Sequence, residues 1–184
     1  MQTLRALENF PISGTYVGQF PTLVAALASV KEAAALANQE LGLLDEKIAR
    51  AIVGAAETLR RGEHGDQFPV DMIQGGAGTS TNMNANEVIA NLALESLGIP
   101  RGSYDVIHPN NHVNLSQSTN DVYPTAVKLA LHASITELQE AMSALAGAFL
   151  AKGEEFSSFI KMGRTQLQDA VPMTLGQEFS AFAH

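Results

Sequence analysis

The sequence contains no cysteine and no tryptophan, and charged residues make up only 16% of its 184 positions. Without cysteine the chain can form no disulfide and no thiolate zinc site, so nothing in it requires an oxidising compartment. It also lacks any run of about 20 consecutive apolar residues, the length that a membrane-spanning helix needs. Its first residues do not read as a secretion signal. These absences predict a cytoplasmic protein that does not enter a membrane.

Positive charge is scarce as well. The chain has 11 lysine and arginine residues against 19 aspartate and glutamate residues, which gives a formal net charge of −8. Arg60 and Arg61 are the only adjacent pair of cations. A surface that grips a phosphate backbone needs clustered cations, so we expect no nucleic-acid partner. An anionic ligand would have to be bound by local donors and helix ends, because the overall field repels it.

Hydrophobic residues, by contrast, make up 46% of the chain, enough for a sizeable core and too many for a disordered protein. They recur every three or four residues in several segments, which predicts amphipathic helices. The segments with this period are 22–41, 45–59, 84–97 and 121–152. We expect Asp45 and Asp121 to cap two of these helices through their side-chain oxygens. Residues 1–21 and 100–120 show no period and read as loops, so the fold class is mainly α.

The last periodic segment, from Asp121 to Lys152, would be about 48 Å long at ~1.5 Å per residue. A compact domain of this chain length is only about 40 Å across, so the helix should protrude and need partners for its apolar stripe. Thr174 and Gln177 have the capping-box spacing that opens a further helix. Because the chain stops at His184 within about three turns of that start, we expect it to be truncated.

Three clusters of polar residues lie between or just ahead of the predicted helices. They are 75–84 (Gly-Gly-Ala-Gly-Thr-Ser-Thr-Asn-Met-Asn), 117–121 (Gln-Ser-Thr-Asn-Asp) and 161–169 (Lys-Met-Gly-Arg-Thr-Gln-Leu-Gln-Asp). Glycine lets a backbone approach a ligand closely, and free N–H groups at a helix start attract an anion. Each cluster alone could equally be ordinary capping or a solvated loop. Together, three clusters rich in neutral donors suit a small dicarboxylate.

The residues of these motifs and their order resemble the aspartase/fumarase superfamily over nearly the whole chain, from Thr3 to its end. Further matching segments are 67–71 (Gln-Phe-Pro-Val-Asp), 108–114 (His-Pro-Asn-Asn-His-Val-Asn) and 170–178 (Ala-Val-Pro-Met-Thr-Leu-Gly-Gln-Glu). Within the superfamily, Ala77, Thr119 and Gln166 favour the aspartase branch, because class II fumarases usually have Ser, Ser and His there. An amide cannot serve as the base that activates water for hydration.

The resemblance implies reversible removal of ammonia from L-aspartate to give fumarate, with a class II fumarate hydratase as the alternative. Residues that bind substrate in the family match Thr79, Ser118, Thr119, Asn120 and Thr165. Candidates for a supporting role are Ser80, Asn82, Arg164 and Gln166. The catalytic base of the family is a serine on a later loop reading Gly-Ser-Ser-x-x-Pro-x-Lys-x-Asn, which does not occur in this chain. We therefore predict no catalytic residue here, expect the base downstream of His184, and expect this chain alone to be an inactive, non-catalytic assembly fragment.

The resemblance also implies an architecture and partners. Residues 1–116 would form an N-terminal helical domain, and 117–184 the beginning of a central bundle of long helices. The family forms homotetramers in which each active site draws on three subunits. It requires no cofactor and no catalytic metal, although some aspartases are activated by Mg²⁺ at a separate site.

Four further residues have more than one interpretation. Asn111 stands where the family commonly has Asp, which concerns a local ion pair or a secondary site. His108 and His112 are four residues apart, as metal ligands on a helix would be, but Pro109 breaks such a helix, and we expect no metal site. Arg164 could be either an anion contact or a structural brace.

Overall fold

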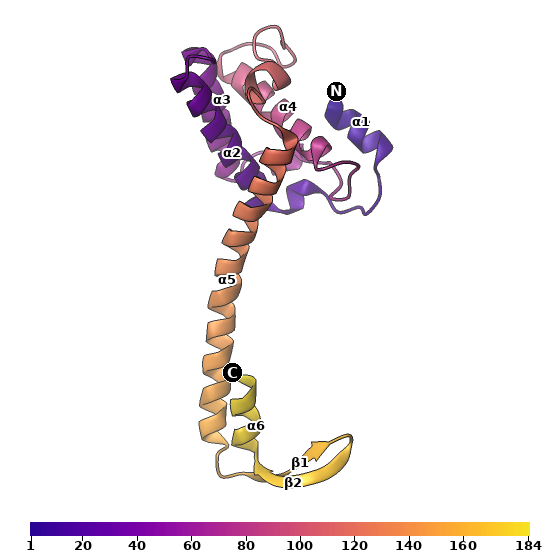
Figure 1. The fold of residues 1–184 in the computed structure, drawn as a ribbon, viewed down its shortest axis with the longest axis vertical. Coiled ribbons are helices and arrows are strands. Elements are labelled where there is room, and N and C mark those ends of the chain that lie inside the picture. The colour runs from indigo at the N-terminus through magenta and orange to yellow at the C-terminus, as the bar shows by residue number, and fades with distance from the viewer. The chain divides into compact units, whose positions relative to one another are not determined.

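The computed structural model describes residues 1–184, and Figure 1 follows the chain from its indigo N-terminus to its yellow C-terminus. The chain forms two compact units, Met1–Ala133 and Ser134–His184. In chain order the elements are α1 (Gln2–Asn9), η1 (Val17–Gln19), α2 (Pro21–Glu40), α3 (Glu46–Arg60), η2 (Gly65–Gln67), α4 (Thr79–Ser96), η3 (Pro109–Val113), α5 (Thr119–Glu155), β1 (Ile160–Thr165), β2 (Gln168–Thr174) and α6 (Leu175–Phe182). The predicted fold class, mainly α, is confirmed.

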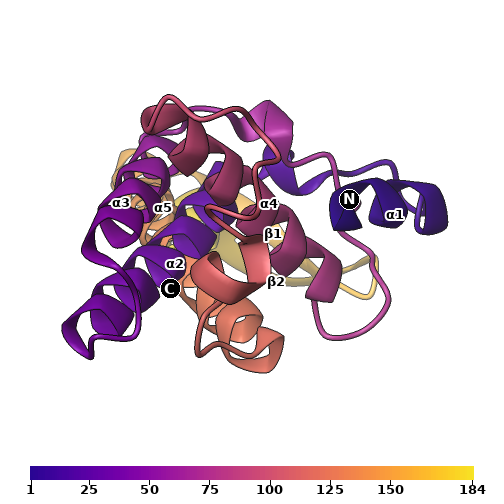
Figure 2. The same ribbon diagram turned by 90° about the horizontal axis from the view of Figure 1, so that it is seen from above.

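The core of the first unit lies between α2, α3 and α4, which pack against one another (Figure 2). Leu27, Ile52 and Ile89 are fully buried there, one from each helix. Each such side chain stabilises the fold by roughly 1.5–3 kcal/mol. Many other core positions are alanine, including the fully buried Ala56 and Ala90. Small side chains let the helices approach closely, and polar side chains of α2 and α4 contact Asn114 in the loop that precedes α5.

The helices predicted from periodicity in the first half of the chain are confirmed. Asp45 caps α3 as expected, since its side chain accepts hydrogen bonds from the backbone N–H groups of Lys47 and Ile48 at 2.9 and 3.2 Å. Gly42 and Gly62 follow α2 and α3 with φ values of 70° and 85°. A residue in this left-handed conformation ends a helix, and glycine adopts it without strain.

The prediction that residues 1–21 form a loop is wrong, because α1 and η1 lie within them. The start of α1 is held by Glu87 of α4, whose carboxylate accepts from the N–H groups of Gln2 and Thr3 at 2.7 and 3.1 Å. The hydroxyl of Thr3 donates to the same carboxylate at 2.7 Å. This cap comes from a residue more than 80 positions away, so no local pattern could predict it.

α4 begins at Thr79, earlier than the predicted start at Asn84. Its first turns carry polar side chains in place of an apolar period, and several are nevertheless buried. Thr81, Asn82 and Asn84 are only 1–2% exposed. The periodicity rule missed these turns because it treats polar residues as solvent-facing.

The long predicted helix is confirmed as α5, a 37-residue helix. Asp121 is not its cap, however, so that prediction is wrong. Ser118 occupies the capping position, and its hydroxyl oxygen accepts from the N–H of Asn120 at 3.1 Å. No helix in the chain is both long and apolar enough to cross a membrane.

The second unit contains the remainder of α5, a two-stranded antiparallel hairpin and α6. The strands pair from Ile160 with Thr174 to Thr165 with Gln168. The alternation of apolar and polar residues in these strands is weak, so no strands are predicted here from the pattern alone. α6 opens with the predicted capping box, in which the hydroxyl of Thr174 accepts from the N–H of Gln177 at 3.1 Å.

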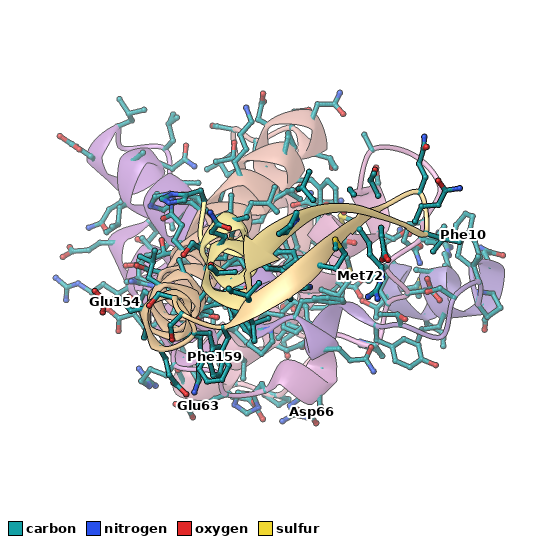
Figure 3. The ribbon with its side chains drawn as sticks, turned by 90° about the horizontal axis from the view of Figure 1, so that it is seen from below. Phe10, Glu63, Asp66, Met72, Glu154 and Phe159 are labelled. Carbon is teal, nitrogen blue, oxygen red and sulfur yellow. The ribbon has the colours of Figure 1, made fainter.

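Aromatic rings and close backbone contacts hold this second unit together. Phe156 lies edge-on to Phe159 with ring centroids 5.7 Å apart, and the Phe159 side chain is labelled in Figure 3. A Cβ atom placed on Gly176 would lie 2.3 Å from the carbonyl oxygen of Gly153. α6 therefore packs directly against the backbone of α5 at these two glycines.

Candidate functional site

The first polar cluster forms the tight entry to α4. Gly78 precedes the helix with φ 79°, and a Cβ atom there would lie 2.3 Å from the ring of Tyr123. Both the left-handed backbone and the ring contact therefore require glycine. No side chain caps α4 at this position. The N–H groups of the first turn, beginning at Thr79, remain available to an anion, and Thr79 itself is exposed.

The second polar cluster forms the entry to α5. Asn114 donates through Nδ2 to the carbonyl oxygen of Gln117 at 3.0 Å, and Gln117 donates through Nε2 to the carbonyl oxygen of Val113 at 2.9 Å. Between them Ser116 has φ 60°, an uncommon conformation for a residue with a side chain. These contacts define the loop 114–118, which delivers Ser118 to the start of α5.

A hydrogen bond joins the two clusters. Nδ2 of Asn82, on the first turn of α4, donates to Oγ1 of Thr119 on α5 at 3.1 Å, and to Oδ1 of Asn114 at 3.1 Å. The structure thus brings together two donor-rich helix starts, which carry Thr79, Ser80, Asn82, Ser118, Thr119 and Asn120. Asn82 is buried and its Oδ1 has no hydrogen-bond partner. A buried amide oxygen without a donor from the protein is uncommon, and Asn84 and Asn86 of the same helix share this feature.

The third cluster lies on the hairpin of the second unit. Thr165 ends β1, and Gln166 and Leu167 form the turn with φ values of 50° and 63°. Nε of Arg164 lies 3.3 Å from Oδ1 of Asp169 across the hairpin, and both side chains are 68% exposed. An exposed pair of this kind contributes at most about 1 kcal/mol. As a structural brace, Arg164 therefore stabilises the hairpin only weakly. That this cluster forms part of the site remains a prediction.

The side chains of the two histidines ahead of the second cluster accept hydrogen bonds from the backbone. Nδ1 of His108 accepts from the N–H groups of Asn110 and Asn111 at 3.0 and 3.2 Å, and Nδ1 of His112 accepts from the N–H of His108 at 2.8 Å. Burial, and secondarily the neighbouring His108, lowers the pKa of His112. A neutral imidazole can accept these hydrogen bonds, so both rings stabilise the turn η3.

Asp71 holds the segment that leads into the first cluster. Its carboxylate accepts from the N–H groups of Ser13 and Gly14 at 2.7 and 2.9 Å, from the Ser13 hydroxyl at 2.7 Å and from the N–H of Ile73 at 2.8 Å. Burial acts to raise the pKa of Asp71, but these hydrogen bonds outweigh it and hold the pKa well below its usual range. The carboxylate is thus a structural anchor rather than an acid or base for chemistry.

Lys31 is the residue near the site that sequence reasoning missed. It lies in the middle of α2 and is fully buried, and its Nζ reaches the loop 114–118. Burial lowers its pKa from 10.5 to about 7. The available signal was its position, since it falls among the apolar residues of the stripe at 22–41, next to Val30 and three residues before Ala34.

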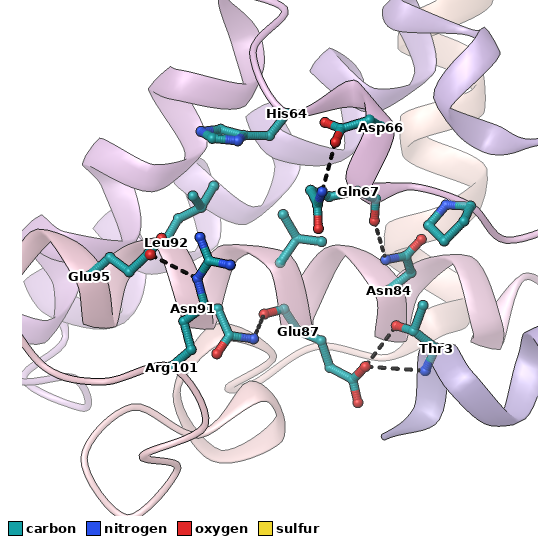
Figure 4. Close-up of a pocket in the computed structure, with 12 residues that line it drawn as sticks. Thr3, His64, Asp66, Gln67, Asn84, Glu87, Asn91, Leu92, Glu95 and Arg101 are labelled. Carbon is teal, nitrogen blue, oxygen red and sulfur yellow. Dashed lines mark hydrogen bonds and ion pairs between the residues drawn. The ribbon is translucent and has the colours of Figure 1, made fainter.

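A cavity of about 350 Å³ lies elsewhere on the first unit, beside α4 (Figure 4). Its carboxylates are already engaged. Glu87 accepts from Thr3, and Oε1 of Glu95 accepts from Nε of Arg101 at 2.7 Å. Asn84 donates to the carbonyl oxygen of Gln67 at 3.0 Å. None of the candidate substrate-binding residues lines this cavity, so the polar clusters, and not the cavity, mark the candidate site.

Comparisons with known proteins agree over the whole chain. The family model described as Lyase matches residues 1–184. An aspartate ammonia-lyase of Pseudomonas canavaninivorans is 61% identical over 183 residues, which cover 100% of this chain and 39% of that protein. The crystal structure of fumarate lyase:delta crystallin from Brucella melitensis in native form has a TM-score of 0.95 and 62% identity, covering 100% of this chain and 43% of that one. A recombinant class II fumarase from Schistosoma mansoni has a TM-score of 0.89 and 40% identity, covering 100% and 38%. The chain thus spans about 39% of the length of the curated relatives it matches.

Proposed function

Because the chain belongs to the lyase family, whose model spans residues 1–184, we propose that the full-length protein is an aspartate ammonia-lyase. It would convert L-aspartate reversibly to fumarate and ammonia. The 61% identity to a relative of that name supports the reaction. The observation that carries the site is the hydrogen bond from Asn82 to Thr119, because it joins two helix starts whose free donors suit the carboxylates of a small dianion.

The difficult step in this reaction is removal of a proton from Cβ of aspartate. The electron pair of the C–H bond moves into the adjacent carboxylate, which becomes a doubly charged aci-carboxylate. That pair then forms the Cα–Cβ double bond as the C–N bond breaks, and the amino group leaves as ammonia with the electron pair of that bond. Donors aimed at the carboxylate oxygens lower the barrier, and loss of one such donor typically costs about 3 kcal/mol.

We assign the donor roles residue by residue. Thr79, Ser118, Thr119 and Asn120 bind the substrate carboxylates and amino group, and Thr165 completes the set from the hairpin. Supporting roles fall to Ser80, Asn82, Arg164 and Gln166. The proton-abstracting serine lies on a loop downstream of His184, so residues 1–184 alone are a non-catalytic assembly fragment in this proposal.

The same proposal includes the assembly. Residues 1–116 are an N-terminal helical domain, and 117–184 begin a central bundle shared by four identical subunits. The support is the apolar stripe on α5, where Ile135, Leu138, Met142 and Leu145 are 49–60% exposed. Large apolar side chains aligned on one helix face mark an interface. The enzyme acts in the cytoplasm, requires no cofactor for the chemistry, and binds Mg²⁺ only as an activator.

The assay that tests the activity follows fumarate absorbance with purified full-length protein, supplied in turn with L-aspartate and L-malate. We expect fumarate from aspartate and none from malate, because Gln166 stands where fumarases usually have a histidine base. Turnover of malate alone would assign the protein to the fumarate hydratases. Turnover of neither would remove both assignments.

The residue roles are tested with Thr119→Val, which keeps the side-chain shape and removes the hydroxyl. We expect kcat/KM for aspartate to fall by about 100-fold, the usual effect of losing one donor to a developing oxyanion. Thr58→Val is the matched control, because Thr58 lies half-buried on α3, and its hydroxyl contacts only the carbonyl oxygen of Gly54 and the side chain of Arg61. Equal activity of the two variants would remove Thr119 from the site.

A further inference from the structure

Lys31 is a buried cation without an anionic partner. It is 0% exposed on α2, and no carboxylate of the chain forms an ion pair with it. Lysine is almost never fully buried unless it is paired, because desolvation of its ammonium group is costly. A methionine or leucine would fill the same space without that cost. The lysine must therefore do something at this position that an apolar side chain cannot do.

The amine of Lys31 donates its hydrogen bonds to the loop 114–118. Nζ donates to Oδ1 of Asn114 at 2.8 Å and to Oε1 of Gln117 at 2.9 Å. Burial lowers the pKa of Lys31 to about 7, so a large share of the amine is neutral at physiological pH. A neutral amine has two N–H groups, and there are two acceptors, so both hydrogen bonds exist in either protonation state.

These two contacts set the orientation of two amide groups. When the oxygens of Asn114 and Gln117 face Lys31, their NH₂ groups face the backbone of the loop. There they donate to the carbonyl oxygens of Gln117, Val113 and Leu115 at 3.0, 2.9 and 3.1 Å. Without a donor at Lys31, the oxygen of Gln117 would lose its donor and that amide could turn over, and Asn114 would keep only its donors on α4. The loop would then lose the contacts that hold Ser116 in its uncommon conformation.

Asn114 also links Lys31 to the other helix start. Its Oδ1 accepts from Nδ2 of Asn82 at 3.1 Å and from Nδ2 of Asn86 at 3.2 Å, in addition to the lysine. Asn82 in turn donates to Thr119. One amide oxygen therefore receives donors from α2 and α4 and ties both helices to the entry of α5.

From this geometry we infer that Lys31 is a positioning residue, which fixes the loop 114–118 so that Ser118 and Thr119 meet the substrate carboxylates. The inference rests on the proposed function for its catalytic consequence. It does not require Lys31 to touch substrate. The chain it acts through is Lys31, the amides of Asn114 and Gln117, and the backbone that leads into α5.

The test uses the full-length enzyme with Lys31→Met, which has a similar length and no donor. A displaced binding group typically costs about 10- to 100-fold in rate, and we expect a fall of this size in kcat/KM, with KM for aspartate raised. Val24→Ala is the matched control, since Val24 is a buried core residue of the same helix and contacts no part of the loop through hydrogen bonds. It should lose stability and keep its KM.

A double variant shows whether Lys31 acts through Thr119. In Lys31→Met with Thr119→Val, the combined loss should be much smaller than the product of the two single losses, because the second change removes a group already misplaced. Losses that multiply would overturn the inference. If Lys31→Met does not fold, Gln117→Met removes one of the two acceptors and takes its place, with about a 10-fold expected loss.

Hydrogen exchange followed by mass spectrometry separates this inference from the proposed function, since it needs no activity. Peptides covering 114–120 should exchange at least several-fold faster in Lys31→Met than in the parent or in Val24→Ala. Unchanged exchange in that segment would overturn the inference even in an active enzyme. Faster exchange in a protein that does not act on aspartate would leave the anchoring role standing and reject the reaction.

Discussion

Neutral amides, rather than charges, join the two helix starts of the candidate site. Asn82 donates through its amide nitrogen. Asn114 and Gln117 both donate and accept, and their oxygens receive donors from segments far apart in the chain. Amides carry donors and an acceptor without net charge, so they bring no repulsion toward an anionic ligand. In a chain with a net charge of −8, this choice keeps acidic groups out of a site for a dianion.

The lowered pKa of Lys31 predicts that the stability of the folded protein depends on pH. Because its pKa in the folded protein, about 7, lies below the unfolded value of 10.5, the unfolded state binds more protons between these values, and stability must rise with pH. Relative to Lys31→Met, the parent should gain about 2 kcal/mol in free energy of unfolding from pH 7 to pH 9. Urea unfolding of both proteins at the two pH values measures this, and a difference that stays constant would contradict it.

Gly78→Ala should be costly on two counts. The substitution forces a side chain into the left-handed region and places Cβ 2.3 Å from the ring of Tyr123, so we expect a loss of about 2 kcal/mol or more in free energy of unfolding. The control is Gly54→Ala in α3, where a Cβ meets nothing within 4 Å. That change should stabilise by about 0.5–1 kcal/mol through helix propensity. Equal urea midpoints for the two variants would contradict the role given to Gly78.

At the scale of elements, two segments near the N-terminus depend on a side chain from a distant part of the chain. α1 begins against Glu87 of α4, and the segment before η1 is held by Asp71. Each carboxylate gathers several N–H or O–H donors that would otherwise lack a partner. These carboxylates replace local capping residues, so the N-terminal segment is ordered only when the core of α4 is in place.

Glu87→Gln should release α1 at neutral pH. Burial acts to raise the pKa of Glu87, yet the hydrogen bonds from Thr3 and its neighbours lower it overall. The stabilisation by Glu87 is therefore present when the pH is above the usual pKa of a carboxyl group. It is lost as the pH falls through the pKa of Glu87 in the folded protein. We expect faster exchange of the amides in α1 for the variant at pH 7. We also expect the stability difference from the parent to shrink in acid. A variant as well protected as the parent at pH 7 would contradict the anchoring role.

At the scale of the whole molecule, the exposed stripe of α5 is the feature that calls for partners. Ile135, Leu138, Met142 and Leu145 follow one another at helical spacing and are 49–60% exposed. An apolar face of this kind is not stable in water alone. The proposed tetramer would bury it and would also bring together polar clusters from different subunits.

Met142→Glu should dissociate the assembly and abolish activity together, because a buried, unpaired carboxylate at an interface is strongly destabilising. Sedimentation of the full-length variant should show smaller species than the parent. Ala144→Glu is the matched control, since it adds the same charge at an exposed position on the face of α5 away from the stripe. A tetramer that persists in Met142→Glu would remove the stripe from the interface.

Removal of metal tests the proposed chemistry without altering the chain. Dialysis against EDTA should leave aspartate turnover measurable, because the proposed barrier reduction comes from hydrogen-bond donors. Mg²⁺ added back should raise the rate of aspartate turnover, because it acts as an activator. Complete and reversible loss of turnover on dialysis would contradict the proposal and require a catalytic metal.

The sequence by itself determined the helices with a clear period and their local caps, such as Asp45 for α3 and Thr174 for α6. It also placed two of the three polar clusters at helix starts. Those features rest on contacts within a few residues, which a pattern can express. Only the tertiary structure decided that α1 is a helix, that α4 starts at Thr79, and that Lys31 is buried against Asn114, 83 residues away. Such contacts depend on how α2 and α4 pack, and burial of a polar side chain has no local signature, because its partners come from the fold.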